Sequence, residues 1–442
     1  MLRRVGREEN VEGAMVPIRD AAFPAPFRSG LEYSAPARGT WNIVHIGMLI
    51  PGAHEIFVCA GSCLRGVVLT AAEMGASDRF STVTIQENNV LEGDMEELLI
   101  EGVSNVVRRL PSRPPAVLVY TSCIHHFMGC DLKRCYRELG QRFPDIQFTD
   151  CYMTPILRKS GLTPDQIMRR QLYTLWKPRA REERAINLIG NNLPTDESSD
   201  LVRLIRRAGW TLRDITLCKT YEQYQEMAAS GYNISYNPVA KEGGRWLEEN
   251  FRQKHLHLPL TCTPEKIDRA METLAALLGV EWTERQALRQ KAMDALDAAK
   301  KVIGDTAVVI DYTALPAPLS LCRLLLEHGF RVERLYVDAF NGAEEEEFQW
   351  LRDNAPGLEI FATVQVRLRV LSRETAEPVL AIGQKAAYFT GSHHFVNIVE
   401  GGGMYGYDGI RRLCELMIEA METDRDPALF IQQKGLGCAC CL

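Results

Sequence analysis

Short apolar strands alternate with amphipathic helices along most of the chain, and this alternation starts three times. The first run opens with the apolar segment 54–61, which ends in a Gly turn and is followed by a helical segment at 62–75. The alternation restarts at 184–192 and again at 305–312. Because alternating strands and helices are typical of parallel sheets covered on both faces, the sequence predicts an α/β fold with three doubly wound parallel-sheet (Rossmann-like) domains.

The restarts also set the expected domain boundaries. An irregular leader rich in Pro, Ala and Arg is expected at 1–37. Three α/β domains are expected at 38–180, 181–303 and 304–425, with long helices in the second of them. The segment 426–442 is expected to be a flexible tail, because it is terminal and its cysteines are spaced by Gly.

Two local expectations concern the third domain. The apolar segments 358–364, 378–383 and 385–390 are all expected to be strands, and 409–422 is expected to be a helix. The acidic run 344–347 is expected to be a solvated helix start.

The composition argues against several classes of function. The 442 residues carry a formal net charge of -6, so there is no basic excess that would favour nucleic acid as a ligand. The sequence has no window of about 18 uninterrupted apolar residues, and the charged N-terminus lacks an apolar signal core. No G-x-G-x-x-G or G-x-x-x-x-G-K-[ST] follows an expected strand, which argues against a nucleotide site of its own. We therefore expect a cytoplasmic protein without membrane or nucleic-acid partners.

The chain contains 13 cysteines, and a disulfide framework is not expected in a large cytoplasmic protein. Cys218, Cys322 and Cys414 lie in Leu- and Ile-rich runs and are expected to be buried hydrophobic residues. Clustered thiols beside Gly, Ser and His instead favour soft-metal or iron–sulfur ligation in a reducing compartment. The clustered cysteines are Cys59, Cys63, Cys123, Cys130, Cys135, Cys151, Cys438, Cys440 and Cys441.

Three of these thiols are expected at one edge of the first sheet. Cys59 and Cys123 each lie at the end of an apolar strand, and Cys63 follows Cys59 by one helical turn. Parallel sheets bind ligands at the carboxyl ends of their strands, so these three residues are the candidate metal ligands. Three thiolates are one fewer than a [4Fe–4S] cluster usually needs, and a partner subunit across a two-fold axis would supply the rest. The alternative is that Cys59 and Cys123 are packed core residues.

Other residues near this edge are weaker candidates. His125 and His126 directly follow Cys123, and they are either hydrogen-bond donors to cluster sulfur, a proton route, or ordinary polar loop residues. Cys151 ends a strand near the same sheet edge and is a candidate for a fourth thiol ligand. The tail cysteines are assigned no catalytic part.

Five motifs resemble those of the nitrogenase component 1 family and occur in the same order along the chain, over about residues 38 to 425. The segment from His54 to Cys59 is similar to the family's His-Gly-Pro-x-Gly-Cys loop, with the same spacing from His to Cys. The segment from Thr121 to Leu132 is similar to its Thr-Cys-(x)5-Gly-Asp-Asp-(Ile/Leu) stretch. The three other similar segments are Gln86–Gly93, Asn187–Asn191 and Met404–Gly409.

The resemblance implies a three-domain subunit that pairs around a two-fold axis, either with a homologous component 1 subunit or with a second copy of itself. It implies an iron–sulfur cluster at the interface, as a [4Fe–4S] or a larger P-cluster-like group, and electrons from a separate ATP-hydrolysing iron protein. Cys59 and Cys123 fall on two of the three family ligand positions. The third position falls near Tyr33 and Ser34, where there is no Cys, so Cys63 is the candidate replacement and Ser34 a weaker one.

A second departure concerns the catalytic cofactor of nitrogenase. Where the family places a cofactor-ligating Cys in the middle domain, this chain has the segment Asn233–Pro238. Where it places a ligating His, this chain has Val396, with His393 and His394 close by. A second metallocofactor therefore depends on a shifted His394, and a pair of surface histidines is the more common explanation. These departures argue against dinitrogen as the substrate.

Three hypotheses follow from the sequence. The first is a nitrogenase-like oxidoreductase component, which reduces an organic substrate other than dinitrogen or partners the subunit that does. The second is a non-catalytic scaffold on which a metallocluster is assembled. The third is an α/β ligand-binding protein without a metal.

Overall fold

The computed structural model describes residues 11–28, 30, 32, 33, 35, 42–153, 161–371 and 377–427. The described residues divide into two compact units. Unit A takes those of Trp41–Pro194 and Gly209–Leu258, and unit B takes those of Met1–Thr40, Thr195–Ala208 and Pro259–Leu442. In this part of the chain no helix combines the length and the apolar character needed to cross a bilayer.

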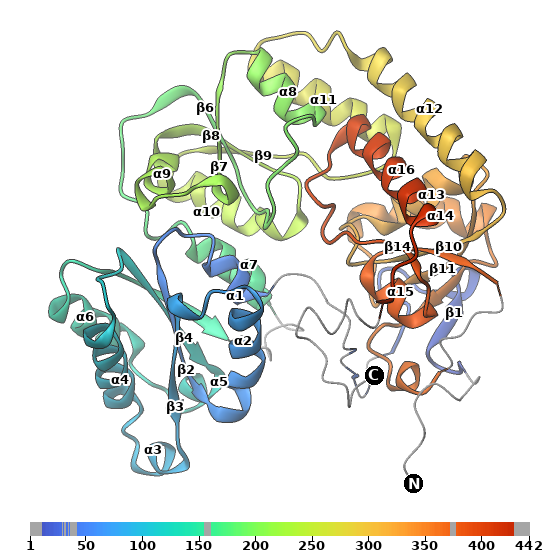
Figure 1. Ribbon diagram of the computed structural model, residues 1–442. Coiled ribbons are helices and arrows are strands. Elements are labelled where there is room, and N and C mark those ends of the chain that lie inside the picture. Colours follow the sequence, from blue (N-terminus) through green and yellow to red (C-terminus); the bar gives the residue numbers. More distant parts are fainter. Residues whose placement is uncertain are drawn as a thin grey trace. The chain divides into compact units, whose positions relative to one another are not determined.

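The first sheet of unit A has the strands β2 His54–Ala60, β3 Phe80–Ile85, β4 Ala116–Ser122 and β5 Gln147–Met153. The strands are parallel, in the order β3-β2-β4-β5. Its helices are α1 Ile43–Gly47, α2 Gly61–Glu73, α4 Met95–Arg109 and α6 Leu132–Arg142. Side chains of β2 and β4 alternate between a core under α1 and α2 and a core under α4 and α6, so helices cover both faces (Figure 1).

The second sheet of unit A has the strands β6 Glu182–Leu188, β7 Thr211–Asp214, β8 Ser230–Ser235 and β9 Lys254–His257. They are also parallel, in the order β7-β6-β8-β9. Helix α10, Lys241–Phe251, connects β8 to β9 and packs against α7, Pro164–Gln171. Just after β6, Gly190 adopts a φ of +88° and packs so closely on Ala240 that an added Cβ would overlap the Ala240 methyl group.

Unit B contains a sheet in the order β1-β12-β11-β10-β13-β14. Its strands are β1 Met15–Pro17, β10 Ala307–Asp311, β11 Arg331–Tyr336, β12 Glu359–Phe361, β13 Val379–Ile382 and β14 His394–Val396. All pairs are parallel except β1 with β12. The described residues thus contain three largely parallel sheets, which confirms the predicted fold class. The segment expected to be an irregular leader supplies β1, which pairs along the edge of β12.

Two local expectations in unit B are wrong. The segment 385–390 is not a strand but belongs to helix α15, Gln384–Thr390, whose seven residues are all buried. The acidic run does begin helix α14, Glu345–Asn354, but Glu344 and Glu347 are only 3% and 0% exposed. Glu347 is compensated by Lys266 Nζ at 2.5 Å and by the Thr263 hydroxyl at 2.8 Å, and this pairing allows a carboxylate to be buried.

Candidate functional site

Cys59 and Cys123 lie within one residue of each other in level, at the ends of adjacent strands. Val58 of β2 is in register with Thr121 of β4, so Cys59 follows at the level of Ser122. Cys123 is the next residue and opens the short helix α5, Cys123–Phe127. The strand ends therefore bring these two predicted ligands to one carboxyl edge of the first sheet.

The third predicted ligand lies in the first turn of the helix that follows β2. Cys63 is the third residue of α2 and is exposed, whereas Cys123 is half-buried and Cys59 is buried. Burial raises the pKa of Cys59 to about 12, the Cys63 and Cys123 thiols add to the rise, and the Ser122 side chain partly offsets it. Cys59 thus lies close enough to both other thiols for their charges to act on it.

These thiols are arranged differently from the ligands of a single ion. Within the described ranges, no group of three or more His, Cys, Asp and Glu side chains is placed to hold one metal ion. The ligands of an iron–sulfur cluster bind different iron atoms and stand farther apart. Soft sulfur donors from three chain positions at one edge match the chemistry of such a cluster.

Among the described residues of unit A, the other cysteines do not join this group. Cys151 pairs with Tyr120 in the sheet register and is buried in the core, below the level of Cys59. Cys135 is buried under α4, and burial raises its pKa to about 12. Cys322 and Cys414 are buried, as predicted, and Cys218 is partly buried. The tail cysteines lie outside the described residues.

A buried histidine follows the thiols. His125 is 1% exposed, and its Nδ1 lies 3.2 Å from the backbone nitrogen of Ser122. A backbone N–H can only donate, so Nδ1 accepts and the neutral ring carries its proton on Nε2. Burial lowers the pKa of His125, which favours this neutral form. Nε2 is buried and has no hydrogen-bond partner among the described residues, whereas His126 is exposed.

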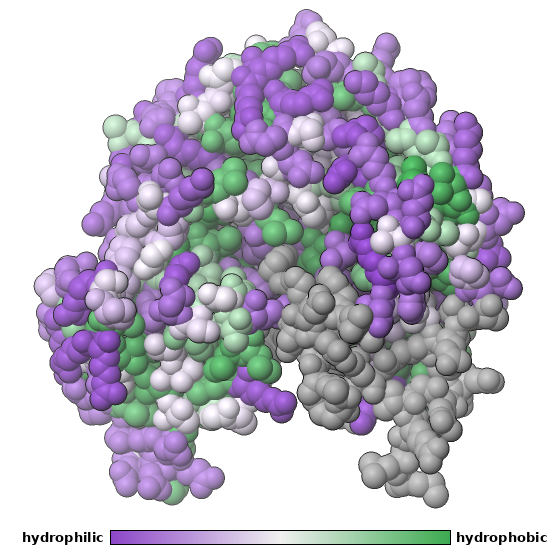
Figure 2. All heavy atoms as spheres, in the orientation of Figure 1, coloured by the Kyte–Doolittle hydropathy of each residue, from purple (hydrophilic) through white to green (hydrophobic). Residues whose placement is uncertain are grey.

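Apolar side chains are exposed on the helices that follow the strand ends. Leu91 is 83% exposed on α3, Glu87–Glu92, and Phe127 is 70% exposed at the end of α5. Val68 and Leu69 are exposed on α2. Apolar residues also reach the surface between polar ones in Figure 2.

The family's third ligand position is occupied differently. The backbone N–H of Tyr33 donates to the Val364 carbonyl at 2.6 Å, and its hydroxyl lies 3.0 Å from that of Tyr388. Tyr33 is therefore held within unit B by the segment after β12 and by α15. Ser34 lies outside the described residues.

At the end of β8, the second sheet of unit A has a polar cluster that the sequence analysis missed. The Ser235 hydroxyl lies 2.8 Å from Nε2 of His255 and 3.0 Å from Nδ1 of His257. Burial lowers the pKa of His257 to about 4. The spacing His-x-His on a strand was an available signal, because residues i and i+2 share a face.

The histidines near Val396 are held by structural contacts. Nδ1 of His394 lies 3.0 Å from the Ala420 carbonyl, and His393 pairs with Asp424 at 2.7 Å on the surface. Both contacts are with the end of helix α16, Gly406–Glu422, or with the residues that follow it. Nδ1 of each ring is therefore engaged by a group of the chain itself.

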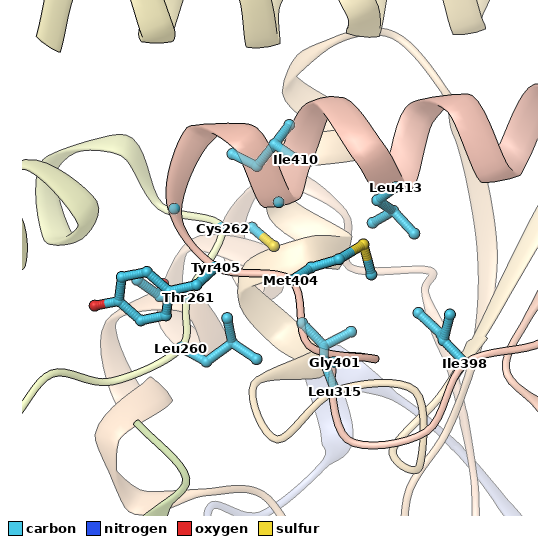
Figure 3. Close-up of a pocket in the computed structure, with 12 residues that line it drawn as sticks. Leu260, Thr261, Cys262, Leu315, Ile398, Gly401, Met404, Tyr405, Ile410 and Leu413 are labelled. Carbon is cyan, nitrogen blue, oxygen red and sulfur yellow. The ribbon is translucent and has the colours of Figure 1, made fainter. Parts of the chain in front are cut away.

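The Gly-rich segment before α16 builds a helix cap. The Asp200 carboxylate accepts the backbone N–H of Tyr407, and Gly406 has a φ of +72° with no room for a Cβ beside that carboxylate. The same segment borders a cavity with largely apolar walls (Figure 3). The residues that line it include Leu260, Cys262, Leu315, Ile398, Met404 and Leu413. None of the lining residues is charged, so the cavity offers no acid–base pair.

Comparisons with known proteins agree with this architecture. The sequence model of the family described as nitrogenase component 1 type oxidoreductase matches residues 44–422. The solved structure of nitrogenase Cp1 at pH 6.5 is similar with a TM-score of 0.67 and 15% identity, over 89% of this chain and 94% of that chain. Nitrogenase Cp1 at pH 5 is similar with a TM-score of 0.59 and 12% identity, over 92% and 94%. A search of curated proteins finds no match.

Proposed function

The chain belongs to the nitrogenase component 1 type oxidoreductases, and from this we propose that it is a nitrogenase-like reductase component of the cytoplasm. In this proposal Cys59, Cys63 and Cys123 hold an iron–sulfur cluster. The protein receives low-potential electrons from an ATP-dependent iron protein. It then reduces an organic substrate other than dinitrogen, or it partners the subunit that does so.

The observation that supports this proposal is that β2 and β4 bring Cys59 and Cys123 to one edge of the first sheet, with Cys63 in the first turn of α2. When bound, an iron–sulfur cluster supplies one-electron redox chemistry. Cys59 would hold it from the buried side, while Cys63 and Cys123 would hold it from the helix starts. The exposed Leu91 and Phe127 support an apolar interface at this edge, where a second component 1 chain would add the missing ligand.

The part of the proposal that concerns the substrate rests on Ser235, at the end of β8. Ser235 lies in the segment where the resemblance places a cofactor-ligating cysteine, and its hydroxyl is already engaged with His255 and His257. A hydroxyl is a poorer ligand for soft metals than a thiolate. This supports a substrate other than dinitrogen.

Anaerobic purification tests the cluster. We expect iron and acid-labile sulfide in the wild-type protein, with an EPR signal on reduction, and a clear loss of both elements in Cys59→Ser and Cys123→Ser. Cys130→Ser is the matched control, because Cys130 is half-buried nearby but is not a proposed ligand. Equal iron content in all four proteins would contradict the ligand assignment.

Turnover tests the reductase role. Mixing with an ATP-dependent iron protein and MgATP is expected to reduce the cluster, whereas the same mixture without ATP is not. A cluster that transfers to an acceptor protein and shows no ATP-dependent reduction would favour the alternative, a scaffold for metallocluster assembly.

A further inference from the structure

We propose that the Nε2–H of His125 donates a hydrogen bond to a sulfur atom of the cluster held at this edge and raises its reduction potential. The inference rests on the function proposed above and adds a positioning and tuning residue to it. His125 is not a ligand in this account.

The direction of the hydrogen bond follows from the structure. The Ser122 N–H occupies Nδ1 at 3.2 Å, so the proton of the neutral ring lies on Nε2 and this atom is a donor. Because Ser122 begins the turn that carries both Cys123 and His125, this contact also fixes the ring relative to a proposed ligand.

The donor lacks an acceptor in the described part of the chain. Nε2 is buried and has no hydrogen-bond partner among the described residues, and the whole residue is only 1% exposed. A buried donor without a hydrogen-bond partner is costly, and native proteins rarely leave one. An acceptor from outside the described chain is therefore expected. At the edge that gathers Cys59, Cys63 and Cys123, thiolate and sulfide sulfur are the acceptors that a cluster would bring.

The effect on the potential has a defined sign. Reduction adds negative charge to the cluster, and a hydrogen bond to sulfur stabilises that charge. Loss of the donor is therefore expected to make reduction harder. A tenfold weaker reduction equilibrium for one electron corresponds to 59 mV.

Two substitutions separate the roles of the two ring nitrogens. Asn at this position keeps an acceptor near Nδ1 and loses the donor at Nε2, whereas Gln keeps a donor near Nε2 and loses the acceptor. We expect His125→Asn to retain wild-type stability and iron content. We expect its midpoint potential to be lower by about 59 mV, which corresponds to a tenfold weaker reduction equilibrium. We expect His125→Gln to retain the potential and to lose stability. His126→Asn is the surface control and is expected to change neither.

Redox titration followed by EPR gives the potentials, and thermal unfolding gives the stabilities. An independent measurement is pulsed EPR on protein labelled with 15N-histidine, in which we expect a hyperfine coupling that persists in His126→Asn and disappears in His125→Asn. A bound cluster without that coupling, or with an unchanged potential in His125→Asn, would overturn the inference alone. Wild-type protein without iron and sulfide would overturn the proposed function together with it.

Discussion

The Oδ2 atom of Asp200 accepts the backbone N–H of Tyr407 at 2.7 Å, although 207 positions separate the two residues in the chain. The carboxylate therefore occupies the first turn of α16, where the helix dipole favours negative charge. Burial raises the pKa of Asp200 to about 6, while its hydrogen bonds with the helix amides act in the opposite direction. Gly406, the first residue of α16, thus has a structural explanation, because only a residue without a Cβ can pass this close to the carboxylate.

Gly406→Ala is expected to destabilise the protein by about 2 kcal/mol or more. The residue has a φ of +72°, and the new methyl group would overlap the Asp200 carboxylate. Urea unfolding measures the loss. Gly357→Ala is the control, because nothing lies within 4 Å of an added Cβ there and its φ is ordinary. Similar losses in both variants would argue against the steric explanation.

Glu344→Gln is expected to change how stability depends on pH. Burial raises the pKa of Glu344 to about 8, so the folded protein holds a proton that the unfolded chain releases near pH 4.5. For the wild type, this group therefore lowers stability as pH rises from about 4.5 to 8. Gln can still accept the Ser320 N–H, which Glu344 accepts at 3.0 Å, and it carries no charge.

The variant is expected to match the wild type near pH 4.5 and to be more stable at pH 8, by on the order of a few kcal/mol. The neighbouring charges, Glu347 and Lys266, are unchanged by the substitution. Urea unfolding at several pH values checks this, with the exposed Glu345→Gln as the control. A stability difference that is independent of pH would contradict the prediction.

Gly190→Ala is expected to destabilise unit A, and Ala240→Gly is expected to rescue part of the loss. The added methyl group would overlap that of Ala240, and removal of the latter restores the space. The rescue is incomplete because the φ of +88° still costs about 1–2 kcal/mol for a residue with a Cβ. Comparing the two single variants with the double variant measures this coupling. Purely additive losses would show that the two positions do not interact.

His257→Asn is expected to reduce the loss of stability in mild acid. Burial lowers the pKa of His257 to about 4, below its ordinary value of 6.5. The unfolded chain therefore takes up a proton before the folded protein does, and stability falls as pH drops from about 6.5 to 4. Denaturant unfolding across this range is expected to show a flatter profile for the variant. His328→Asn serves as the control, and a profile as steep as that of the wild type would argue against the prediction.

The fold class, and the placement of Cys59 and Cys123 at one edge of the first sheet, could be predicted from the sequence because both depend on local patterns. Apolar runs such as 56–59 are buried on both faces, and parallel strands bring their carboxyl ends together without any detailed packing information. Cys59 and Cys123 could therefore be placed near each other. Cys63 could be placed in the first helical turn for the same reason.

The errors arise where burial removes the local signal. Helix α15 is buried on every side, so its residues lack the one-sided apolar pattern of a surface helix, and Tyr388, Phe389 and Thr390 favour a strand. Glu344 and Glu347 are buried through partners distant in the chain, Ser320 and Lys266. The cluster of Ser235 with the two histidines depends on the register between β8 and β9, which composition does not determine.

The short strand β1 has a practical consequence for handling the protein. Met15–Pro17 cover the outer backbone edge of β12 through three register pairs. Trimming the chain beyond residue 17 would leave that edge open for pairing with other molecules, which is a common origin of aggregation. Shortened versions made for crystallisation should therefore keep these three residues, and affinity tags should be separated from them by a spacer.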